Sequence, residues 1–593
     1  MSTLVAALPR RVSGGSFLIE DIGPQDIFTP EDLSDVQRQI ERTTTDFAEK
    51  QVRPQIAAIE AKNFEVTRGL LRKAGELGLM SIDVPEEYGG LEMDKVTSAL
   101  IADKIAACGS FSVAFSAHAG IGTLPLVWYG TAEQKEKYLS KLASGEWIAA
   151  YALSESSSGS DAMNIRTQAK LSPDGKHYVL NGEKMWISNA GMASLFTVFA
   201  KIDGEKFSAF LIEAGTPGLT VGPEEHKLGI RGSSTCTLIL NDCQVPVENL
   251  LGEAGKGHHI AFNVLNVGRY KLGASTIGGA KYAYRDGILY ARERIAFSKP
   301  IASFGLVQEM IADSAAAIYA GESLVYRVVG AIDRSLAELD KISATRMQDI
   351  QRGIEEFAVE CSIVKVWCSE MLDGVVDQML QLHGGYGYVE EFPAERSYRD
   401  SRINRIFEGT NEINRLIISG FMLRRAMQGR IALLPAIQRV MDEVLAGPAA
   451  REERSGELAN QHALLANAKK LALFCAGAAS QKFGSALADQ QEIMGALADM
   501  MMEVLVLESA VLRTEKMNGA SPLAAKMTKY YAARSFRTVG SAAERVLGAA
   551  AEGDTLRTQM AIFRRLTKHE PENTVTLGRE IAAAITEAGR FTL

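Results

Sequence analysis

Glu408 is the residue of this sequence whose surroundings best suit acid–base chemistry. It follows two large apolar residues, Ile406 and Phe407, and precedes Gly409 and Thr410. Thr410 has the side chain of a helix N-cap, so Glu408 is predicted to lie in a short connection just before a helix. Burial beside apolar side chains would raise the pKa of its carboxyl group and make it a stronger base near neutral pH. An exposed linker acid is the commoner case, and this stretch by itself leaves both interpretations open.

Two further stretches carry side chains that could contact a planar, polar ligand. Residues 156–161 read SSSGSD, whose hydroxyls and backbone N–H groups could hold a polar ligand edge. Residues 183–191 read EKMWISNAG, in which Trp186 precedes Ser188 at the predicted end of a strand, where functional residues often lie. A flat aromatic beside hydroxyl groups would suit a planar heterocycle. The structural alternatives are a solvated turn for the first stretch and a core tryptophan for the second.

A glycine-rich run, QLHGGYGY, occupies residues 381–388. Its glycines would let the backbone approach a ligand closely. The run does not match the G-x-G-x-x-G fingerprint of dinucleotide-binding proteins, and it follows a predicted helix rather than a strand. A helix C-cap followed by a turn is therefore the favoured interpretation of this run taken alone.

The composition excludes several classes of protein. Hydrophobic residues make up 47% and charged residues 23%, as in an ordinary soluble globular protein, and the net charge of -8 does not fit a nucleic-acid-binding surface. The six cysteines form no C-x-x-C pair, so no disulfide framework is expected, and their scatter fits a reducing compartment. No H-E-x-x-H motif occurs, and no metal site is expected. No uninterrupted apolar run approaches the roughly 18 residues of a membrane-spanning helix. Arg10 and Arg11 are too few to favour a transit peptide, so a flexible N-terminal arm is expected.

The hydrophobic period changes along the chain and predicts its domains. Helical spacing gives way to short β-branched and aromatic runs and then returns in long amphipathic segments. The predicted fold is mainly α with an inserted antiparallel β-barrel or sandwich, followed by a four-helix bundle and a helical extension. The predicted parts are an arm (1–29), a helical domain (30–146), a β domain (147–253), the bundle (254–427) and the extension (428–593). Turns between strands are predicted at Asn181-Gly182, Asp203-Gly204 and Asn241-Asp242.

Six segments occur in the order found in the acyl-CoA dehydrogenase family. They are SSGSDAMNIRT, KMWISNAG, LNVGRYKLGA, RIAFSKPI followed by LVQ, QLHGGYGY and RIFEGTNEINR. The resemblance covers about residues 30–425. The chain is most similar to the long members, of the very-long-chain type, because residues 451–471, REERSGELANQHALLANAKKL, resemble their helical extension.

The resemblance implies an FAD enzyme that converts an acyl-CoA thioester to the trans-2-enoyl-CoA. Glu408 matches the catalytic base of the E-G-T motif, which takes the α-proton while a hydride leaves Cβ for flavin N5. In the family, the backbone N–H of this glutamate and a ribityl hydroxyl of FAD bind the enolate oxygen. The positions that match FAD contacts are Tyr151, Leu153, Ser154, Gly159, Ser160, Trp186, Ser188, Thr410 and Glu412, together with Arg294, Phe297, Gln308, Gln381, Gly384 and Gly385, which in the family reach the FAD of a neighbouring subunit. The positions that match acyl-CoA contacts are Ser160, Asn266, Arg269 and Phe407.

The resemblance also implies a substrate class and partners. Ser112, Ser116 and Ala117 stand where medium-chain relatives carry larger polar residues, which predicts a deep acyl tunnel and a long-chain substrate. Ser154 and Ser188 replace threonines that are usual in the family and keep the hydroxyl group. The expected partners are a second copy in a homodimer and, in fatty-acid β-oxidation, electron-transferring flavoprotein as the electron acceptor.

The expected location is the bacterial cytoplasm, or the mitochondrial matrix if the chain is eukaryotic. A peripheral membrane contact through residues 420–444 is the alternative to a helix packed within the protein, which is favoured. Two other functions are weighed: a flavoenzyme of the same fold with another substrate, such as a nitroalkane oxidase, and a non-catalytic assembly factor. The intact E-G-T motif and the set of matching FAD contacts disfavour both.

Overall fold

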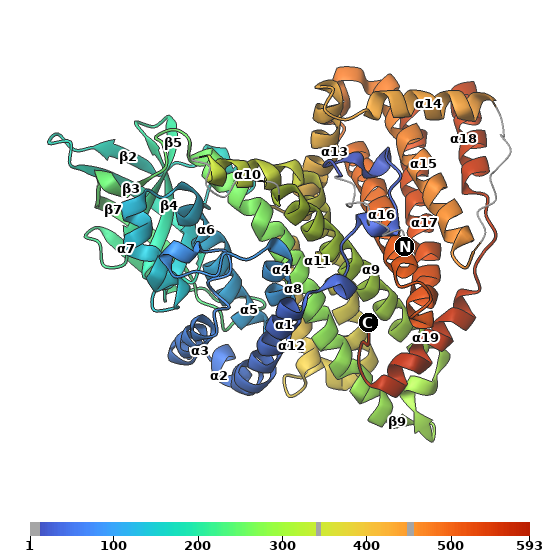
Figure 1. Ribbon diagram of the computed structural model, residues 1–593, viewed down its shortest axis with the longest axis horizontal. Helices are drawn as coiled ribbons and strands as arrows, with labels where there is room; N and C mark the ends of the chain where they lie inside the picture. The colour runs from blue at the N-terminus through green and yellow to red at the C-terminus, as the bar shows by residue number, and fades with distance from the viewer. Residues whose placement is uncertain (1–11, 338, 340–344, 447–455) are drawn as a thin grey trace, which may run out of the picture.

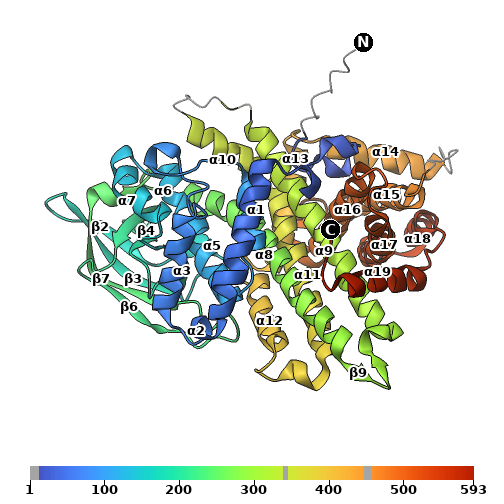
Figure 2. The ribbon, with the colours of Figure 1, turned by 60° about the horizontal axis from the view of Figure 1, so that its bottom comes forward.

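The computed structural model describes residues 12–337, 339, 345–446 and 456–593. The β domain lies at one end of the molecule and the C-terminal helical extension at the other, with the helical bundle between them (Figure 1). The N-terminal helical domain packs beside the β domain and against the bundle (Figures 1 and 2). The arrangement confirms the predicted fold class.

Several helices of the N-terminal domain begin at residues with capping side chains. Its helices are α1 (Asp35–Phe47), α2 (Ile56–Glu60), α3 (Phe64–Glu76), α4 (Lys95–Lys104), α5 (Gly109–Ser116), α6 (Leu124–Tyr129) and α7 (Ala132–Ala143). Side-chain oxygens of Ser34, Asp94 and Thr131 accept backbone N–H groups in the first turns of α1, α4 and α7. Residues 95–103 of α4 are all buried, because the helix packs against α1 and against α8 (Gly257–Glu293) and α9 (Gly305–Leu336) of the bundle. The helix α4 thus attaches the N-terminal domain to the bundle.

The β domain is one sheet with the strand order β6-β7-β3-β2-β4-β5-β8, in which β1 also pairs with β4. Its strands are β1 (Ala149–Ala152), β2 (Gln168–Leu171), β3 (His177–Ser188), β4 (Leu195–Ile202), β5 (Lys206–Glu213), β6 (Leu219–Glu224), β7 (Thr235–Pro246) and β8 (Leu250–Leu251). Most pairings are antiparallel, as predicted, but β1 and β2 run parallel to β4. The strands β4 and β5 are buried along almost their whole length, whereas β6 is largely exposed at the edge of the sheet.

Two of the three predicted turns in this domain are wrong. Asp203-Gly204 does connect β4 to β5, with φ angles of 54° and 78°. Asn181-Gly182 and Asn241-Asp242 instead lie inside β3 and β7, which pair with each other through a register shift at this point. The Asn181 side chain donates to Asp242 Oδ1 at 3.0 Å and accepts the N–H of Asp242 at 2.9 Å. Because a β-bulge and a tight turn favour the same residue types, only the strand pairing distinguishes them.

The bundle is formed by α8, α9, α11 (Ala358–His383) and α13 (Asn411–Met427), with α10 (Arg346–Glu356) and α12 (Pro393–Ser401) beside them. The helix α11 packs against the other three long helices and therefore lies at the centre of the bundle. It ends at His383 because Gly384 takes a positive φ of 58°, which a glycine adopts without steric cost. The helix C-cap interpretation of the glycine-rich run is confirmed.

The extension packs against the bundle through a polar as well as an apolar interface. Its helices are α14 (Leu433–Ala446), α15 (Ala459–Phe483), α16 (Gln491–Lys516), α17 (Pro522–Ala550), α18 (Gly553–Thr567) and α19 (Thr574–Ala588). The helix α16 contacts α9 and α13, and buried ion pairs join Arg513 to Glu322 at 2.9 Å and Glu508 to Arg327 at 2.6 Å. Residues 451–455 of the stretch that resembles the family's extension lie outside the described residues.

One face of α14, in the segment that could contact a membrane, packs against the rest of the protein. Leu433, Val440 and Val444 of α14 are buried, and the helix lies against α15. Pro435 lies in the first turn of α14, where backbone N–H groups have no hydrogen-bond partner within the helix. A proline there costs no helical hydrogen bond, so Pro435 is compatible with the start of α14 and does not interrupt it. The favoured packed-helix interpretation is confirmed for α14.

The described part of the predicted N-terminal arm, residues 12–29, is packed rather than free. Phe17 and Leu18 are buried, and the N–H of Gly15 donates to Glu360 of α11 at 2.6 Å. Lys469 of the extension donates to the carbonyl of Glu20 at 3.0 Å. The expectation of a flexible arm is wrong for these residues, because Phe17 and Leu18 are buried where the segment contacts α15 and α16 of the extension. Residues 1–11 lie outside the described residues.

Within the described residues, the helical segments 109–129 and 305–336 are long and apolar enough to cross a membrane. In the folded protein, 78% and 94% of their most apolar windows are buried against other parts of the chain. Core helices of globular domains have the same length and composition.

Candidate active site

Glu408 lies in a short loop, residues 406–410, which connects the short helix η12 (Arg402–Arg405) to α13. The hydroxyl of Thr410 accepts the N–H of Ile413 at 3.3 Å. Thr410 is therefore the N-cap of α13, and the predicted position of Glu408 just before this helix is confirmed.

The backbone of this loop is strained at the acidic residue. Glu408 has a φ angle of +59° and Gly409 one of +82°. The left-handed region is unfavourable for a glutamate and easy for a glycine. The side-chain amide of Asn414 holds the loop in place by donating to the carbonyls of Gly409 at 2.8 Å and Thr410 at 3.1 Å. Strain of this kind is often found where the surrounding structure positions a functional group.

The carboxylate of Glu408 lies against Gly268 in α8. A Cβ atom at position 268 would come within 2.6 Å of Oε2, so only a glycine leaves room for the acid. Oε2 is buried and has no hydrogen-bond partner among the described residues. Burial raises the pKa of Glu408 to about 7, while the cations of Arg269 and Lys365 act in the opposite direction. A desolvated carboxylate with this pKa can act as a base near neutral pH.

Side chains from α8 and β1 lie near this carboxylate. In α8, Arg269 donates to Asn266 Oδ1 at 2.9 Å and, through Nε, to the carbonyl of Glu408 at 3.4 Å. The hydroxyl of Tyr151 in β1 donates to a backbone carbonyl of α8 at 3.4 Å, and its pKa is raised by burial and by the negative charge of Glu408. The structure thus brings the predicted residues Asn266, Arg269 and Tyr151 together with Glu408, and Phe407 lies half-buried beside them.

Lys365 of α11 supports the loop from inside the bundle. Its side chain is fully buried, and Nζ donates to the carbonyl of Gly409 at 2.7 Å and to Asn411 Oδ1 at 2.6 Å. Burial lowers the pKa of Lys365 to about 7, and the carboxylate of Glu408 opposes this shift. The hydrogen bond to the Gly409 carbonyl holds Nζ of Lys365 next to the acid.

Trp186 in β3 is an exposed aromatic on a strained backbone. Its side chain is 59% exposed, its φ angle is +59°, and it lies in the register shift between Lys184 and Ile187. The alternative of a core tryptophan is wrong, because the bulge turns this ring outward. Ser188 follows at the end of the strand and is half-buried. A large exposed aromatic ring on a backbone with an unfavourable φ angle is typical of a ligand-binding surface.

A buried ion pair supports the polar loop at residues 154–160. Lys184 of β3 is fully buried and donates to Glu155 at 2.7 Å, and Glu155 also accepts the hydroxyl of Thr167 at 2.6 Å. Ser154 accepts the N–H of Met185 at 2.9 Å, which joins the run to the strand that carries Trp186. Gly159 and Ser160 are exposed at the outer side of the loop. The first stretch is therefore an exposed turn, as the structural alternative predicted, and a backbone hydrogen bond places it beside the strand that carries Trp186.

The remaining predicted ligand contacts form a second group. They are Arg294, Phe297, Gln308, Gln381, Gly384 and Gly385. Arg294, Gly384 and Gly385 line a cavity of about 530 Å³, in which the Arg294 guanidinium lies 5.5 Å from the ring centre of Tyr386. Phe297 is 91% exposed. This region, around β9 (Ile295–Ala296), lies at the end of the bundle remote from the β domain (Figures 1 and 2). Within one chain, the second group does not meet the first.

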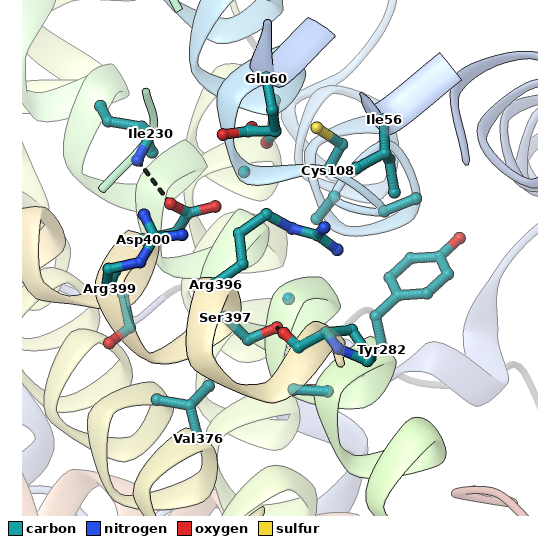
Figure 3. Close-up of a pocket in the computed structure, with 18 of the residues that line it drawn as sticks. Ile56, Glu60, Cys108, Ile230, Tyr282, Val376, Arg396, Ser397, Arg399 and Asp400 are labelled. Atoms are coloured by element: carbon teal, nitrogen blue, oxygen red, sulfur yellow. Dashed lines mark hydrogen bonds between the residues drawn. The ribbon is translucent and has the colours of Figure 1, made fainter. Parts of the chain in front are cut away.

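A cavity of about 710 Å³ lies behind the loop, between α2, α5, α8, α11 and α12 (Figure 3). Asn404 of η12 lines it, whereas Glu408 and Trp186 do not. Asp400 faces it and accepts the N–H of Ile230 at 2.5 Å, and burial raises the pKa of Asp400 to about 7. This bond ties the β domain to α12, which leads directly into η12 and the loop. The cavity therefore lies outside the candidate site. Asp400 in its wall helps to position α12 and η12, which lead to the loop of Glu408.

Sequence reasoning missed Gly268, Lys365, Asn414 and Lys184. Lys365 carried a signal, because it is a single cation inside the apolar run SIVKVWC. Lys184 had no comparable signal, because Glu183 and Trp186 beside it in EKMWIS are exposed. Gly268 and Asn414 had no local signal. Their roles depend on a loop that reaches them only in the folded chain.

Comparison with known proteins agrees with this architecture. The profiles of the acyl-CoA dehydrogenase N-terminal, middle and C-terminal domains match residues 34–146, 150–243 and 255–423, and a further acyl-CoA dehydrogenase C-terminal domain profile matches residues 467–565. A probable acyl-CoA dehydrogenase of Bacillus subtilis (strain 168) is 49% identical over 585 residues, which are 98% of each chain. The mitochondrial very long-chain specific acyl-CoA dehydrogenase of Macaca fascicularis is 40% identical over 58% of this chain and 51% of its own length.

A solved structure shows the same fold over almost the whole chain. The crystal structure of an acyl-CoA dehydrogenase complexed with FAD from Bacillus anthracis is 48% identical, with a TM-score of 0.96, and the alignment covers 98% of this chain and 100% of that one. The chain therefore belongs to the acyl-CoA dehydrogenase family, the FAD-dependent oxidoreductases that act on the CH–CH bond of an acyl-CoA.

Proposed function

We propose that Glu408 is the catalytic base and takes the α-proton of a long-chain acyl-CoA thioester. The observation that carries this proposal is the buried Oε2 atom, which has no hydrogen-bond partner among the described residues and belongs to a group with a pKa of about 7. A thioester α-C–H is a weak acid, so a base that removes its proton must be poorly solvated and fixed in position. Gly268 provides the space for the carboxylate, and Lys365 and Asn414 fix the loop that carries it.

The same loop offers a donor for the negative charge that develops on the thioester oxygen. Within the described part of the chain, the N–H of Glu408 donates no hydrogen bond. The positive φ angle keeps this N–H out of the helical pattern of α13. A fixed donor aimed at a developing oxyanion lowers the barrier of the reaction, so the strained backbone serves catalysis as well as placing the side chain.

FAD fits the surface formed by Trp186, Ser188 and the loop at residues 154–160. The exposed indole offers a flat face, and the serine hydroxyls and the exposed backbone around Gly159 offer polar contacts. The same surface is proposed to include Tyr151, Leu153, Ser154, Ser160, Thr410 and Glu412. FAD, when bound, accepts the hydride that leaves Cβ.

The second group of predicted contacts supports a homodimer. Arg294 and Gly385 lie at the far end of the bundle, so a flavin bound beside Trp186 would meet such a group only on a second copy of the chain. The open cavity there and the 91% exposed ring of Phe297 are suited to such a contact. In solution, size-exclusion chromatography with light scattering tests this, and a flavin-loaded monomer would contradict it.

A long-chain substrate and a place in fatty-acid β-oxidation are proposed from two features. The first is the extension, which is a feature of the long members that the sequence resembles. The second is the set of small side chains on and just after α5, Ser112, Ser116 and Ala117, which stand where medium-chain relatives carry larger polar residues. The proposed electron acceptor is electron-transferring flavoprotein, and the proposed location is the bacterial cytoplasm.

The central test is Glu408→Gln, which keeps the size of the side chain and removes its basicity. The variant is expected to bind FAD, as judged by its yellow colour, and to lose about three orders of magnitude in the oxidation of palmitoyl-CoA, since a positioned base contributes about 10²–10⁴-fold. Turnover near that of the wild type would overturn the assignment of the base.

Chain-length preference is tested separately by anaerobic bleaching of the flavin with a straight-chain series from butyryl-CoA to palmitoyl-CoA. We expect the fastest bleaching with the longer substrates. A preference for butyryl-CoA would contradict the long-chain proposal and leave the role of Glu408 untouched.

A further inference from the structure

We propose that the helical extension, residues 456–593, holds the loop that carries Glu408, and that Asp499 of α16 is a positioning residue for the reaction. This inference rests on the proposed role of Glu408 as the base. The geometry behind it is an unbroken chain of hydrogen bonds, which runs from the extension through α13 and α11 to the carbonyl of Gly409.

The outer half of this chain crosses the interface between the extension and the bundle. The helix α13 packs between α16 on one side and α11 on the other. Arg415 of α13 donates through Nε to Asp499 Oδ1 at 2.7 Å. Its two terminal nitrogens donate to the two carboxylate oxygens of Glu370 in α11, at 2.7 and 2.9 Å. A single planar guanidinium is therefore fixed on both edges, which sets its orientation.

The inner half of the chain passes from Glu370 to the loop. Asn411, in the first turn of α13, donates to Glu370 Oε1 at 2.9 Å and accepts Nζ of Lys365 at 2.6 Å. Lys365 in turn donates to the carbonyl of Gly409 at 2.7 Å, next to the base. The orientation of the Asn411 amide decides where Lys365 can reach, and Glu370 fixes that orientation.

The exposure of these groups indicates that their main effect is on position rather than on stability. The side chains of Asp499, Arg415 and Glu370 are 34%, 19% and 37% exposed. Water screens these partly exposed charges more than fully buried ones, so losing one of them should cost less stability than losing a buried charge. The Arg327–Glu508 pair provides a comparison, because it also joins α16 to the bundle but its side chains are only 7% and 4% exposed. Arg327 lies on α9 and has no part in the chain of bonds that leads to the loop.

A shift of Lys365 would change the acidity of the base as well as its position. The charged or titratable groups that face Glu408 are Arg269 from α8, Lys365 from α11 and Tyr151 from β1. Glu370 and Glu412 face Lys365. Because the Lys365 cation lowers the pKa of Glu408, moving it away raises that pKa above about 7. A rise of about one unit would reduce the carboxylate fraction at pH 7 from about one half to about one tenth, a loss of about fivefold in rate.

The test compares Asp499→Asn with the matched control Glu508→Gln, in which the same helix loses a carboxylate that pairs with an arginine of the bundle. Both flavin-loaded variants are measured in three ways. Stopped-flow flavin reduction is followed from pH 6 to pH 9 with the acyl-CoA that bleaches the wild type fastest. Hydrogen–deuterium exchange is measured for the peptide that covers residues 402–415. The melting temperature is measured by differential scanning fluorimetry.

We expect opposite patterns from the two variants. Asp499→Asn should reduce flavin about fivefold more slowly at pH 7, shift the midpoint of the pH profile upward and speed exchange in residues 402–415, with a small change in Tm. Asp499→Glu should restore part of the rate. Glu508→Gln should lower Tm more, because it leaves a buried arginine with one partner fewer, and keep the wild-type midpoint and exchange in residues 402–415.

The inference is overturned if the two variants have the same pH midpoint and the same exchange in residues 402–415, since the extension would then contribute stability alone. If Asp499→Asn does not fold, Arg415→Lys replaces it, because lysine keeps the charge but cannot bind both carboxylates in the same geometry. Failure of the proposed function has a different signature. Glu408→Gln would then keep its turnover, whereas Asp499→Asn would still change exchange in the loop.

Discussion

Replacing Glu408 by glutamine is expected to make the protein more stable relative to the wild type, by an amount that grows with pH. Burial raises the pKa of Glu408 to about 7 in the folded chain, against an ordinary value of 4.5. A group with a raised folded-state pKa makes its full contribution to stability below its unfolded pKa and loses that contribution as the pH rises through the folded-state value. The wild type therefore loses stability between about pH 4.5 and 7, whereas glutamine does not ionise and has no such loss.

The size of the effect follows from the two pKa values. A difference of about 2.5 corresponds to about 3 kcal/mol at 1.36 kcal/mol per unit, and about 2.5 kcal/mol of this develops between pH 5 and pH 8. This is an upper limit, because the loop can move and let water reach the carboxylate. An unfolding entropy of about 2.1 cal/mol/K per residue over 593 residues gives about 1.2 kcal/mol/K. The difference in Tm between variant and wild type should therefore widen by about 2 °C.

Differential scanning fluorimetry of the flavin-loaded proteins at pH 5, 6, 7 and 8 measures this widening. Glu412→Gln is the matched control, since Glu412 also lies at the start of α13 but its pKa is lowered by the backbone N–H groups there. It stays ionised throughout this range, so its Tm difference from the wild type should be constant. A difference for Glu408→Gln that stays constant or shrinks with rising pH would refute the conclusion that the folded protein buries this carboxylate.

Two further predictions concern residues that hold the site from behind. In Gly268→Ala, the added Cβ lies within 2.6 Å of Glu408 Oε2 and displaces the carboxylate. The rate of flavin reduction should therefore fall by about a hundredfold, while the FAD content stays that of the wild type. A wild-type rate would show that the carboxylate lies elsewhere. In Lys184→Met, the buried carboxylate of Glu155 loses its cation, which should cost about 3–5 kcal/mol, lower Tm and reduce the FAD absorbance per protein. The double variant Lys184→Met/Glu155→Gln should recover part of the lost Tm, and no recovery would mean that the ion pair is not what braces the loop.

Much of the site was determined by residue type and local order. The N-cap at Thr410, the helix end at Gly384 and the connection that carries Glu408 were all predicted from the sequence and are found in the structure. These features depend on the preferences of a few neighbouring residues, such as a threonine hydroxyl near a free N–H or a glycine at a positive φ angle. The change of hydrophobic period likewise predicted the order of helical and β domains, because burial on one face repeats with the period of the element.

Pairing between distant segments was decided only by the tertiary structure. Asn181-Gly182 and Asn241-Asp242 have the composition of turns, yet they form a bulge because β3 and β7 lie side by side. Trp186 has the neighbours of a core residue, but a register shift turns its ring to the surface. In both cases the local preferences are satisfied by two conformations, and the contact with another strand selects one of them.

The sequence by itself determined which acid is the candidate base, and the tertiary structure decided that its loop is supported and that its buried Oε2 atom has no hydrogen-bond partner among the described residues. The burial of Glu408 comes from Gly268 in α8, its support from Lys365 in α11, and the support of Lys365 reaches back to Asp499 in the extension. None of these contacts lies within a few residues of Glu408 in the sequence. Desolvation and charge act through space, so the pKa of a carboxyl group depends on what the fold places around it.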